Sequence, residues 1–459
     1  MTATFTDDLI IDAATLAALS GRLCGTLLTA QQYEYDAARW LVNARFDAPR
    51  PALIARCLSA QDVSESIIFA REYGLEIAVR SGGHSLSGQS TVDGGLLIDL
   101  SQMRQIAISP AQRIARVQPG ASSGEVVLAA QRYGLATVTG TCATVGMGGS
   151  TLGGGIGWLM GRFGMTIDNV LSMELVTADG AIINVSADEH PNLFWGLRGG
   201  GGNFGVVTAI SYRLHPLDVV VGGMAIFHLA VAPLVLRMYR ELTHSAPDEL
   251  MAHATLTNVP DLGPALILQP VYSGADLAEG ERLLAPLRRF GPPAVDLIGR
   301  RSYADLYMML TPPLPPGAST YDTAYSLRQP SDTALDQIVA SAGERPTPIS
   351  LINIHQIHGA ATRIAPDATA FALREPHLAV VNSGMWLEGD GAESMAWSRD
   401  AQAQIQRYAS AGVYANFLGD ADERGVRESY RANYARLAAL KAEHDPENIF
   451  RRNQNIAPA

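Results

Sequence analysis

Residues 78–88 read AVRSGGHSLSG, and the organisation of the whole chain can be worked out from this stretch. An apolar strand ends at Val79, a basic residue follows, and small residues then surround one histidine, His84. The three glycines permit positive φ angles and allow several backbone N–H groups to point at one anion. The stretch predicts either a nest for a phosphate or pyrophosphate, or an ordinary glycine turn with a surface histidine. The rest of the sequence is needed to distinguish the phosphate nest from the glycine turn.

The composition is that of a globular protein with more than one domain. The chain has 459 residues, of which 47% are hydrophobic and 17% are charged, and this length predicts two domains. The net charge of -11, without a basic block, disfavours nucleic acid and anionic membranes as partners. No apolar run reaches about 18 residues, the length of a membrane-spanning helix. The acidic start lacks the features of a signal peptide, so we expect a cytoplasmic protein.

The sequence around His84 predicts a β-α-β unit within a longer alternation of strands and helices. Ser59 is the expected N-cap of the first helix, and Gly74 is expected to follow its C-terminus. Residues 1–45 are expected to be a helical lead-in, because Ala and Leu recur with helical spacing over 13–28. Strands are predicted over 52–57, 76–80, 96–99, 114–118 and 206–214, and helices over 61–73 and 123–133.

A second glycine-rich stretch runs from Gly140 to Gly164 and contains ten glycines. Each glycine in regular structure costs roughly 0.5–1 kcal/mol relative to alanine, so this density indicates backbone that lies against a flat or charged ligand. A flexible linker is the alternative. However, apolar residues such as Leu152, Trp158 and Phe163 are interleaved with the glycines, and linkers do not carry that much apolar surface.

The pattern changes near Leu217, where the glycine clusters stop. Alternating segments such as 265–274 and 378–387 predict antiparallel strands, and helices are expected between them. We therefore predict an α+β protein with a first domain over 1–217 (core from about 46), a second domain over 218–411, and a segment over 412–459 that returns to the first domain. This last segment is predicted to contain one helix over 426–443.

With these segments in place, the chain resembles the FAD-linked oxidases of the vanillyl-alcohol-oxidase superfamily, most closely the bacterial berberine-bridge-enzyme-like branch with a doubly tethered flavin. The resemblance implies a PCMH-type FAD-binding domain of two α/β subdomains, and a substrate domain whose antiparallel sheet is flanked by helices. The motifs that carry it span nearly the whole chain: RSGGHSLSG (80–88), GTCATVG (140–146), GGGIGWLMGRFGMTIDNV (153–170), LFWGLRGGGGNFGVVT (193–208), YANF (414–417) and HDPENIFRRNQNI (444–456).

The resemblance assigns two covalent links to the flavin. His84 would bond to the 8α-methyl group, and Cys142 stands where relatives with two links carry a thioether to C6. A cysteine among glycines beside an electron-poor ring can react as a thiolate; the alternative is a buried free cysteine. Ala143 replaces a proline that is frequent in the family. Cys57, in a predicted buried strand, and Cys24, in the lead-in, are expected to be structural. Three cysteines are too few for a disulfide framework.

The same resemblance implies further contacts to FAD. Residues 80–85 would wrap the pyrophosphate, and the C-terminal tail would return to the flavin. No metal is expected, because no His/Cys/Asp cluster has ligand spacing. The implied cofactor residues are Arg80, Ser81, Gly82, Gly83, His84, Ser85, Gln89, Gly140, Thr141, Cys142, Val145, Gly146, Gly149, Gly153, Gly154, Gly157, Asn203, Gly205, Val207, Tyr414, Asn416, Asn453 and Asn455.

Three residues are candidates for catalysis. Val145 would lie near the point where dioxygen reacts, and a small residue there is typical of oxidases in this family. Tyr414 would assist removal of a substrate proton; with an ordinary pKa near 10 its anion must be stabilised by the site, and the alternative is a core tyrosine bonded to backbone. Gln356 occupies about the position of an acidic catalytic residue in some relatives, and it either contacts substrate or packs in the sheet.

Strand alternation separates the side chains of residues 350–358. Ile352, Ile354 and Gln356 are predicted to share one face, and Asn353 and His355 the other. His355 and His358 are candidates for substrate contact rather than for catalysis.

The expected function is oxidation of a small molecule by FAD with dioxygen as the acceptor. A hydride would pass from a C–H of an alcohol or amine, on a bulky natural product or a saccharide, to flavin N5, and dioxygen would be reduced to hydrogen peroxide. Two alternatives remain open: an oxidative cyclase of secondary metabolism on the same fold, and a flavin-binding protein without turnover.

Overall fold

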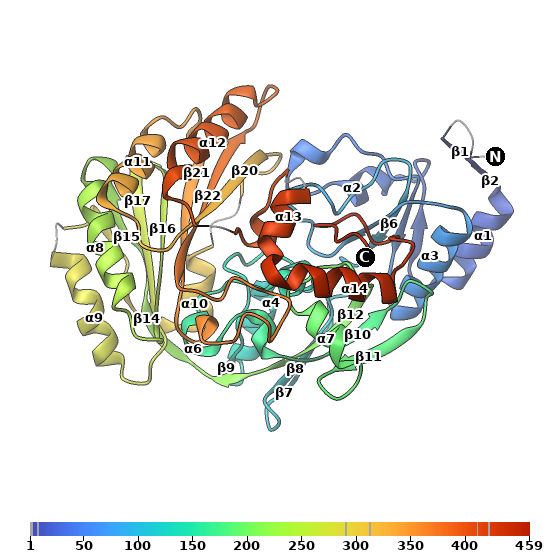
Figure 1. Cartoon of the computed structure of the whole chain (residues 1–459), viewed down its shortest axis with the longest axis horizontal. Coiled ribbons are helices and arrows are strands. Elements are labelled where there is room, and N and C mark those ends of the chain that lie inside the picture. Colours follow the sequence, from blue (N-terminus) through green and yellow to red (C-terminus); the bar gives the residue numbers. More distant parts are fainter. Residues whose placement is uncertain (1–2, 7–8, 290–291, 312–313, 411, 421–422) are drawn as a thin grey trace.

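Two sheets built from the first half of the chain lie on one side of the molecule, and one large sheet from residues 219–386 lies on the other (Figure 1). The computed structural model describes residues 3–6, 9–289, 292–311, 314–410, 412–420 and 423–459. Residue 411, the expected end of the second domain, is outside the described residues. The mixture of helices with a large antiparallel sheet confirms the predicted α+β class.

The first sheet delivers His84. Its strands lie in the order β3 (Thr26–Leu28), β4 (Leu53–Arg56), β6 (Leu96–Asp99) and β5 (Ile77–Arg80), and the last three are parallel. Helix α3 (Ala60–Glu72) connects β4 to β5. Ser59 accepts a hydrogen bond from the Asp62 N–H at its start, and Gly74 has a φ of 64° after its end. The predicted β-α-β unit is therefore confirmed.

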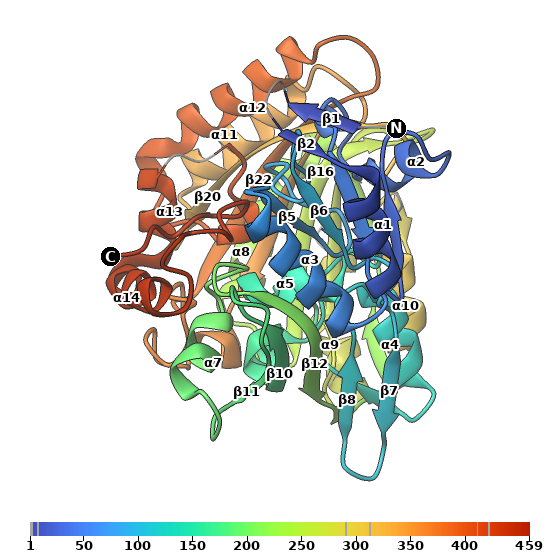
Figure 2. The same cartoon turned by 90° about the vertical axis from the view of Figure 1, so that its right-hand side faces the viewer.

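The second sheet carries the glycine-rich segments. Its antiparallel strands lie in the order β11 (Ile182–Ser186), β10 (Val170–Val176), β12 (Val206–Arg213), β8 (Ile114–Val117) and β7 (Ile106–Ser109). Around it lie α4 (Ser123–Gln131), α5 (Met147–Gly153) and α7 (Pro191–Leu197). Helix α14 (Tyr434–His444), from the end of the chain, packs against α7 (Figures 1 and 2).

The large sheet is antiparallel, and helices cover one of its faces. The helices α8 (Ala232–His244), α9 (Leu277–Arg289), α11 (Asp332–Gly343) and α12 (Ala392–Ile405) pack on that face. The other face is turned toward the first half of the chain (Figure 1). Its strands lie in the order β18 (Val295–Asp296), β15 (Ala225–His228), β17 (Gly263–Tyr272), β16 (Leu250–Val259), β21 (Leu351–Ile357), β22 (His377–Trp386) and β20 (Ser319–Leu327), with β14 (Val219–Gly222) and β19 (Gly299–Ser302) beside this path.

The structure corrects two predicted helices. The helix predicted over 13–28 ends early, as α1 (Ala13–Arg22), because the chain turns to pair β3 with β4. Gly25 permits this approach: a Cβ there would lie 1.9 Å from the Arg56 carbonyl oxygen. The helix predicted over 426–443 is divided into α13 (Glu423–Tyr430) and α14, because Arg431 between them has a φ of 51°.

The two cysteines expected to be structural have different surroundings. Cys57 is buried in the apolar core that includes β4, as expected. Cys24 is exposed. Among the described residues, no helix has the length and apolarity required to span a membrane.

A buried ion pair fixes the C-terminal segment. Lys441, the only lysine of the chain, donates from Nζ to Asp445 Oδ2 at 2.6 Å, and both side chains are fully buried. The same Nζ donates to the carbonyl oxygens of Asn203 at 2.8 Å and Phe450 at 3.0 Å. One cation thus ties α14 to the loop before β12 and to the tail.

Replacing Asp445 by asparagine should destabilise the protein strongly. Asp445→Asn leaves the Lys441 ammonium buried without a counter-charge, which costs on the order of 3–5 kcal/mol. The matched control is Glu423→Gln, in the Glu423–Arg427 pair with the same spacing but exposed side chains, which should cost at most about 0.5 kcal/mol. Urea denaturation measures both free energies of unfolding. Equal losses in the two variants would contradict the role given to Lys441.

Candidate active site

The histidine loop, residues 80–88, starts at the carboxyl end of β5. Arg80 Nη2 lies 2.7 Å from Asp99 Oδ2, Arg80 Nη1 donates to the Trp40 carbonyl at 3.1 Å, and the Asp99 side chain is fully buried. The Arg80 side chain therefore holds the loop in place and is committed to protein partners. Contact of Arg80 with a pyrophosphate stays a prediction, and its guanidinium already has these protein partners. Binding of a pyrophosphate by the backbone N–H groups of residues 81–85 stays a prediction as well.

The cysteine loop, residues 140–146, touches the histidine loop where the backbones of Gly82 and Gly146 meet. A Cβ on Gly82 would lie 2.3 Å from Gly146 N, and a Cβ on Gly146 would lie 2.4 Å from Gly82 N. Real Cβ atoms do not approach backbone this closely, so both positions require glycine. The contact brings the two predicted flavin links to one place. The His84 ring hydrogen-bonds to the backbone of Thr144, and Cys142 Sγ lies 3.3 Å from Thr144 Oγ1.

Burial keeps the His84 imidazole neutral. It lowers the pKa of His84 to about 4, and the hydrogen bond to the Thr144 backbone opposes this shift only in part. At neutral pH the ring therefore has one unprotonated nitrogen with a free lone pair. That is the state from which an imidazole can form a covalent bond as a nucleophile.

Helix α10 (Tyr303–Met309) supports the cysteine loop from the side of the large sheet. The Tyr307 hydroxyl donates to the Gly140 carbonyl at 2.5 Å, and Thr311 Oγ1 donates to the Thr141 carbonyl at 3.2 Å. The position of Cys142 is thus set by both halves of the molecule.

Tyr414 lies against the glycine-rich end of α5. Its hydroxyl oxygen accepts hydrogen bonds from Gly155 N–H at 2.9 Å and from Asn416 Nδ2 at 2.8 Å. Burial raises the pKa of Tyr414 to about 12, and the two donors oppose that rise. Gly153 makes room for this arrangement, since a Cβ there would lie 2.2 Å from Asn416 Oδ1. The tyrosine is buried and bonded to backbone, and its oxygen also has the two donors that a phenolate requires.

The predicted C-terminal residues divide into two groups. Asn203 is an anchor for the tail: Nδ2 donates to the Gln454 carbonyl at 3.2 Å, and Oδ1 accepts from Ile456 N–H at 3.0 Å. By contrast, the side-chain oxygens of Asn453 and Asn455 are buried and have no hydrogen-bond partner within the described part of the chain. Of these three predicted residues, Asn453 and Asn455 are the two that offer free acceptors.

Gln356 lies away from this site. Its Oε1 accepts from Ala252 N–H at 2.9 Å, and its Nε2 donates to the Thr243 carbonyl at 3.0 Å. Both amide atoms are used to join β21 to β16 and to the end of α8. The structure therefore favours the sheet-packing alternative over contact with substrate.

The remaining predicted residues lie along the same loops. Ser81 donates to the Pro119 carbonyl, and Ser85 Oγ accepts from Gln89 N–H at 3.1 Å. Val145 is half-buried beside Cys142, whereas Val207 is buried within β12. The glycines expected to contact FAD are placed as follows: Gly83 has a φ of 71°, Gly149 has open space at its Cβ position, and Gly154, Gly157 and Gly205 lie against other parts of the chain.

Sequence reasoning missed the polar side chains on the site-facing side of the large sheet. His253 and Gln269 lie directly opposite one another on β16 and β17. Thr255 Oγ1 donates to Asn353 Oδ1 at 2.8 Å across β16 and β21. In residues 250–259, His253 and Thr255 alternate with apolar residues, and this pattern predicts that they share one face of a strand. The sequence does not show which strands pair with this one, so it could not place the two side chains at the site.

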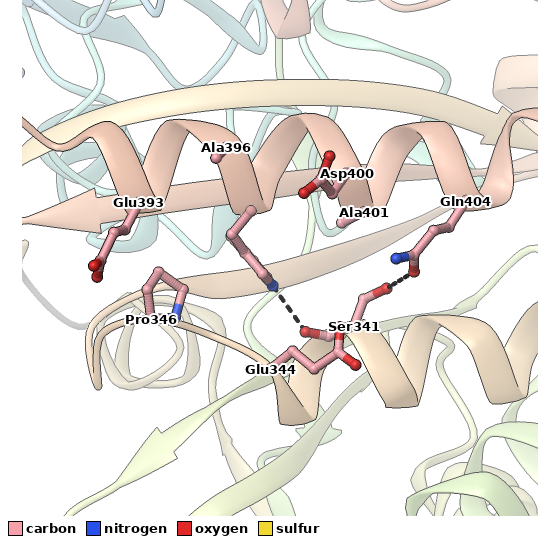
Figure 3. Close-up of a pocket in the computed structure, with 9 residues that line it drawn as sticks. Ser341, Glu344, Pro346, Glu393, Ala396, Asp400, Ala401 and Gln404 are labelled. Atoms are coloured by element: carbon pink, nitrogen blue, oxygen red, sulfur yellow. Dashed lines mark hydrogen bonds between the residues drawn. The ribbon is translucent and has the colours of Figure 1, made fainter.

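Two cavities border the large sheet. One, of about 390 Å³, lies between β20 and residues 412–420, and Phe417 forms part of its wall. The other is a groove of about 350 Å³ between α11 and α12, on the helix-covered face (Figure 3). Glu393 and Asp400 line that groove, which is remote from both loops. Within the described chain, no group of three His, Cys, Asp or Glu side chains could hold a metal ion.

The residues at the two loops fit FAD. The backbone contact between Gly82 and Gly146 leaves N–H groups without covering side chains, as a pyrophosphate requires. The free oxygens of Asn453 and Asn455 suit the N–H and hydroxyl donors of a flavin and its ribityl chain. The neutral ring of His84 and the sulfur of Cys142 both contact Thr144. Phosphate-type, hydrogen-bonding and covalent contacts are thus all available.

Comparisons with known proteins agree with this fit. Residues 51–186 match a family model described as an FAD binding domain, and residues 413–457 match one described as berberine and berberine like. The (R)-6-hydroxynicotine oxidase of Paenarthrobacter nicotinovorans is 34% identical over 434 residues, which cover 89% of this chain and 92% of that protein. An FAD-linked oxidoreductase of Bacillus subtilis is 30% identical over 449 residues, 95% of this chain and 98% of that protein.

Solved structures show the same architecture. The crystal structure of 6-hydroxy-D-nicotine oxidase from Arthrobacter nicotinovorans superposes with a TM-score of 0.87 and 31% identity, over 95% of this chain and 98% of that one. Berberine bridge enzyme from Eschscholzia californica superposes with a TM-score of 0.87 over 98% of this chain and 99% of that one, at 21% identity, which shows the fold alone.

The fold and the site define an FAD-dependent oxidoreductase of the PCMH type. The chain belongs to the berberine-bridge-enzyme-like family of FAD-linked oxidoreductases, as its motifs predicted.

Substitution of Gly146 should disrupt FAD binding. Gly146→Ala places a Cβ against the Gly82 backbone, so the two loops must separate, and we expect the ratio of flavin absorbance to protein to fall severalfold. Gly21→Ala is the matched control, because nothing lies within 4 Å of its Cβ position; alanine inside α1, away from both loops, should keep flavin content. Normal flavin content in Gly146→Ala would show that the contact is not required.

Proposed function

We propose that this protein is an FAD-dependent oxidase with a flavin attached through both His84 and Cys142. The observation that carries the proposal is the Gly82–Gly146 contact, which places both side chains beside Thr144. When bound, FAD accepts a hydride equivalent from the substrate and passes the electrons to dioxygen, which becomes hydrogen peroxide. The side chains of the protein bind the substrate, orient it and accept its proton.

Tyr414 takes the proton in this proposal. Its oxygen is the proton acceptor, and Gly155 N–H and Asn416 Nδ2 stabilise the phenolate. Val145, half-buried between Cys142 and Gly146, keeps that side of the ring accessible to dioxygen because its side chain is small.

The substrate class is an alcohol or amine carried on a bulky natural product or a saccharide. The relatives support this range: two are named for 6-hydroxynicotine, and proteins of the same fold are named for chitooligosaccharide and for xylooligosaccharide. Oxygen consumption and peroxide release against nicotine derivatives, monolignols and short saccharides test the function. If none of the compounds reduces the flavin anaerobically, the oxidase proposal falls and a flavin-binding protein without turnover is left.

The two covalent links can be tested by acid precipitation. The wild-type protein should give a yellow pellet, and the single variants His84→Ala and Cys142→Ala should each keep one link and remain yellow. The double variant should release all its flavin into the supernatant. Cys24→Ala, which removes an exposed cysteine, serves as the control. A colourless wild-type pellet overturns the double attachment.

The role of Tyr414 predicts a pH profile. A pKa raised to about 12 means that the phenol is almost wholly protonated at pH 7, and the reactive phenolate increases as the pH rises. The rate of substrate-dependent flavin reduction should therefore rise with pH without a plateau below about pH 10. Tyr414→Phe should lower this rate by about 10²–10⁴-fold and abolish the rise.

The control for this experiment is Tyr212→Phe. Tyr212 is also fully buried, and its hydroxyl hydrogen-bonds to Thr151 at 2.7 Å, so this variant should lose stability while it keeps the rate and the pH profile. If both variants show the wild-type profile, Tyr414 has only a structural role.

A further inference from the structure

Three adjoining rings on the site-facing side of the large sheet each leave a nitrogen without a partner. The ring centroids of Trp158 and His253 are 4.4 Å apart, and those of His253 and His355 are 4.9 Å apart. Their side chains are buried. Within the described residues, Trp158 Nε1, His253 Nε2 and His355 Nδ1 have no hydrogen-bond partner. Buried polar atoms are nearly always hydrogen-bonded, so three adjacent exceptions point to a polar group that binds there.

The backbone determines which atom of His253 is the donor. His253 Nδ1 accepts a hydrogen bond from Gln356 N–H at 3.1 Å. Burial lowers the pKa of His253 well below its ordinary value, so the ring is neutral. A neutral imidazole whose Nδ1 accepts must carry its proton on Nε2. Trp158 Nε1 is always a donor. Two adjacent buried donors therefore require an acceptor atom, and the absence of charge on both favours an uncharged oxygen.

The cluster lies between the residues assigned to the reaction. Phe417 joins His355 to Tyr414, with ring centroids 5.2 Å and 4.9 Å from theirs. At the other end, Gln269 lies opposite His253, and its Nε2 donates to the carbonyl oxygen of Leu310 at 3.4 Å. Leu310 directly follows α10, the helix that contacts the cysteine loop through Tyr307. A group bound here is held between the proposed proton acceptor and the proposed second flavin link.

Phe417 lies next to both the cluster and a cavity. This side chain is half-buried, its ring contacts that of His355, and it forms part of the wall of the cavity of about 390 Å³ beside β20.

We propose that Trp158 Nε1–H and His253 Nε2–H bind an uncharged oxygen of the substrate, a hydroxyl or carbonyl group, and that His355 offers its free nitrogen to the same group. These residues then determine specificity: they select substrates with an oxygen function beside the oxidised carbon and position it next to Tyr414. The inference rests on the proposed oxidase function for its role in the reaction, but the binding site can be tested without turnover.

The first test measures binding with benzyl alcohol and toluene, which differ by one hydroxyl group. The five tryptophans of the chain give five indole N–H signals in a ¹⁵N–¹H spectrum of the holoenzyme, and Trp158→Phe identifies the signal of Trp158. Benzyl alcohol should shift this signal, and toluene should not. A Trp158 signal that does not move, or that moves equally with toluene, overturns the proposal.

The second test separates recognition from structure. Trp158→Phe removes the N–H together with the pyrrole part of the indole, so the Kd for benzyl alcohol should rise about five- to tenfold, as expected for one lost hydrogen bond, while the Tm falls no further than in the control. The matched control is Trp397→Phe, whose N–H donates to the Ser341 carbonyl at 2.9 Å on the helix-covered face; it should lower the Tm and leave the Kd unchanged.

The result is independent of the oxidase test. A selective Trp158 shift in a protein that produces no peroxide would support the oxygen-binding site and remove the oxidase function. Unchanged Kd in Trp158→Phe, in a protein that does produce peroxide, would overturn the site and leave the function intact.

Discussion

The structure of the site depends on the contact between two backbone segments at Gly82 and Gly146. One segment leaves a parallel sheet, and the other leads into α5, so they belong to different subdomains. They can touch only because neither position carries a Cβ. The glycines lose more chain entropy on folding than other residues would, and the contact is maintained because each loop is fixed independently. Arg80 binds Asp99 on one side, and Tyr307 holds the cysteine loop on the other.

The site also requires a fixed position of the large sheet relative to these loops. A buried ion pair fixes this position: Arg374 Nη1 and Nη2 lie 2.8 Å and 2.9 Å from the two carboxylate oxygens of Asp168, and both side chains are almost fully buried. Asn43 adds two hydrogen bonds to the Thr320 backbone from the opposite side. Buried ion pairs are weak evidence for stability, but a two-point Arg–carboxylate pair is directional. Its contribution here is to fix the geometry.

Local patterns were enough to predict the elements, but not which side chains meet. The β-α-β unit around α3 and the alternation along β21 follow from apolar spacing and caps, and both were predicted correctly. The partner of Arg80 was invisible, because Asp99 lies on another strand of a parallel sheet. Gln356 and His355 are neighbours in sequence, but the Gln356 side chain lies on the helix-covered face of the sheet and the His355 side chain lies on the face turned toward the site. The break at Arg431 also depends on long-range contacts, since that residue pairs with Glu375.

Burial disfavours the charged form of four titratable side chains around the proposed reaction centre. It lowers the pKa values of His84 and His355 to about 4, lowers that of His253 well below its ordinary value, and raises that of Tyr414 to about 12. Each shift disfavours the charged form, whatever its sign. Such a site penalises any step that leaves a net charge on the protein. In the proposed reaction, a proton taken up by the Tyr414 phenolate leaves that side chain neutral, which is the state that burial favours.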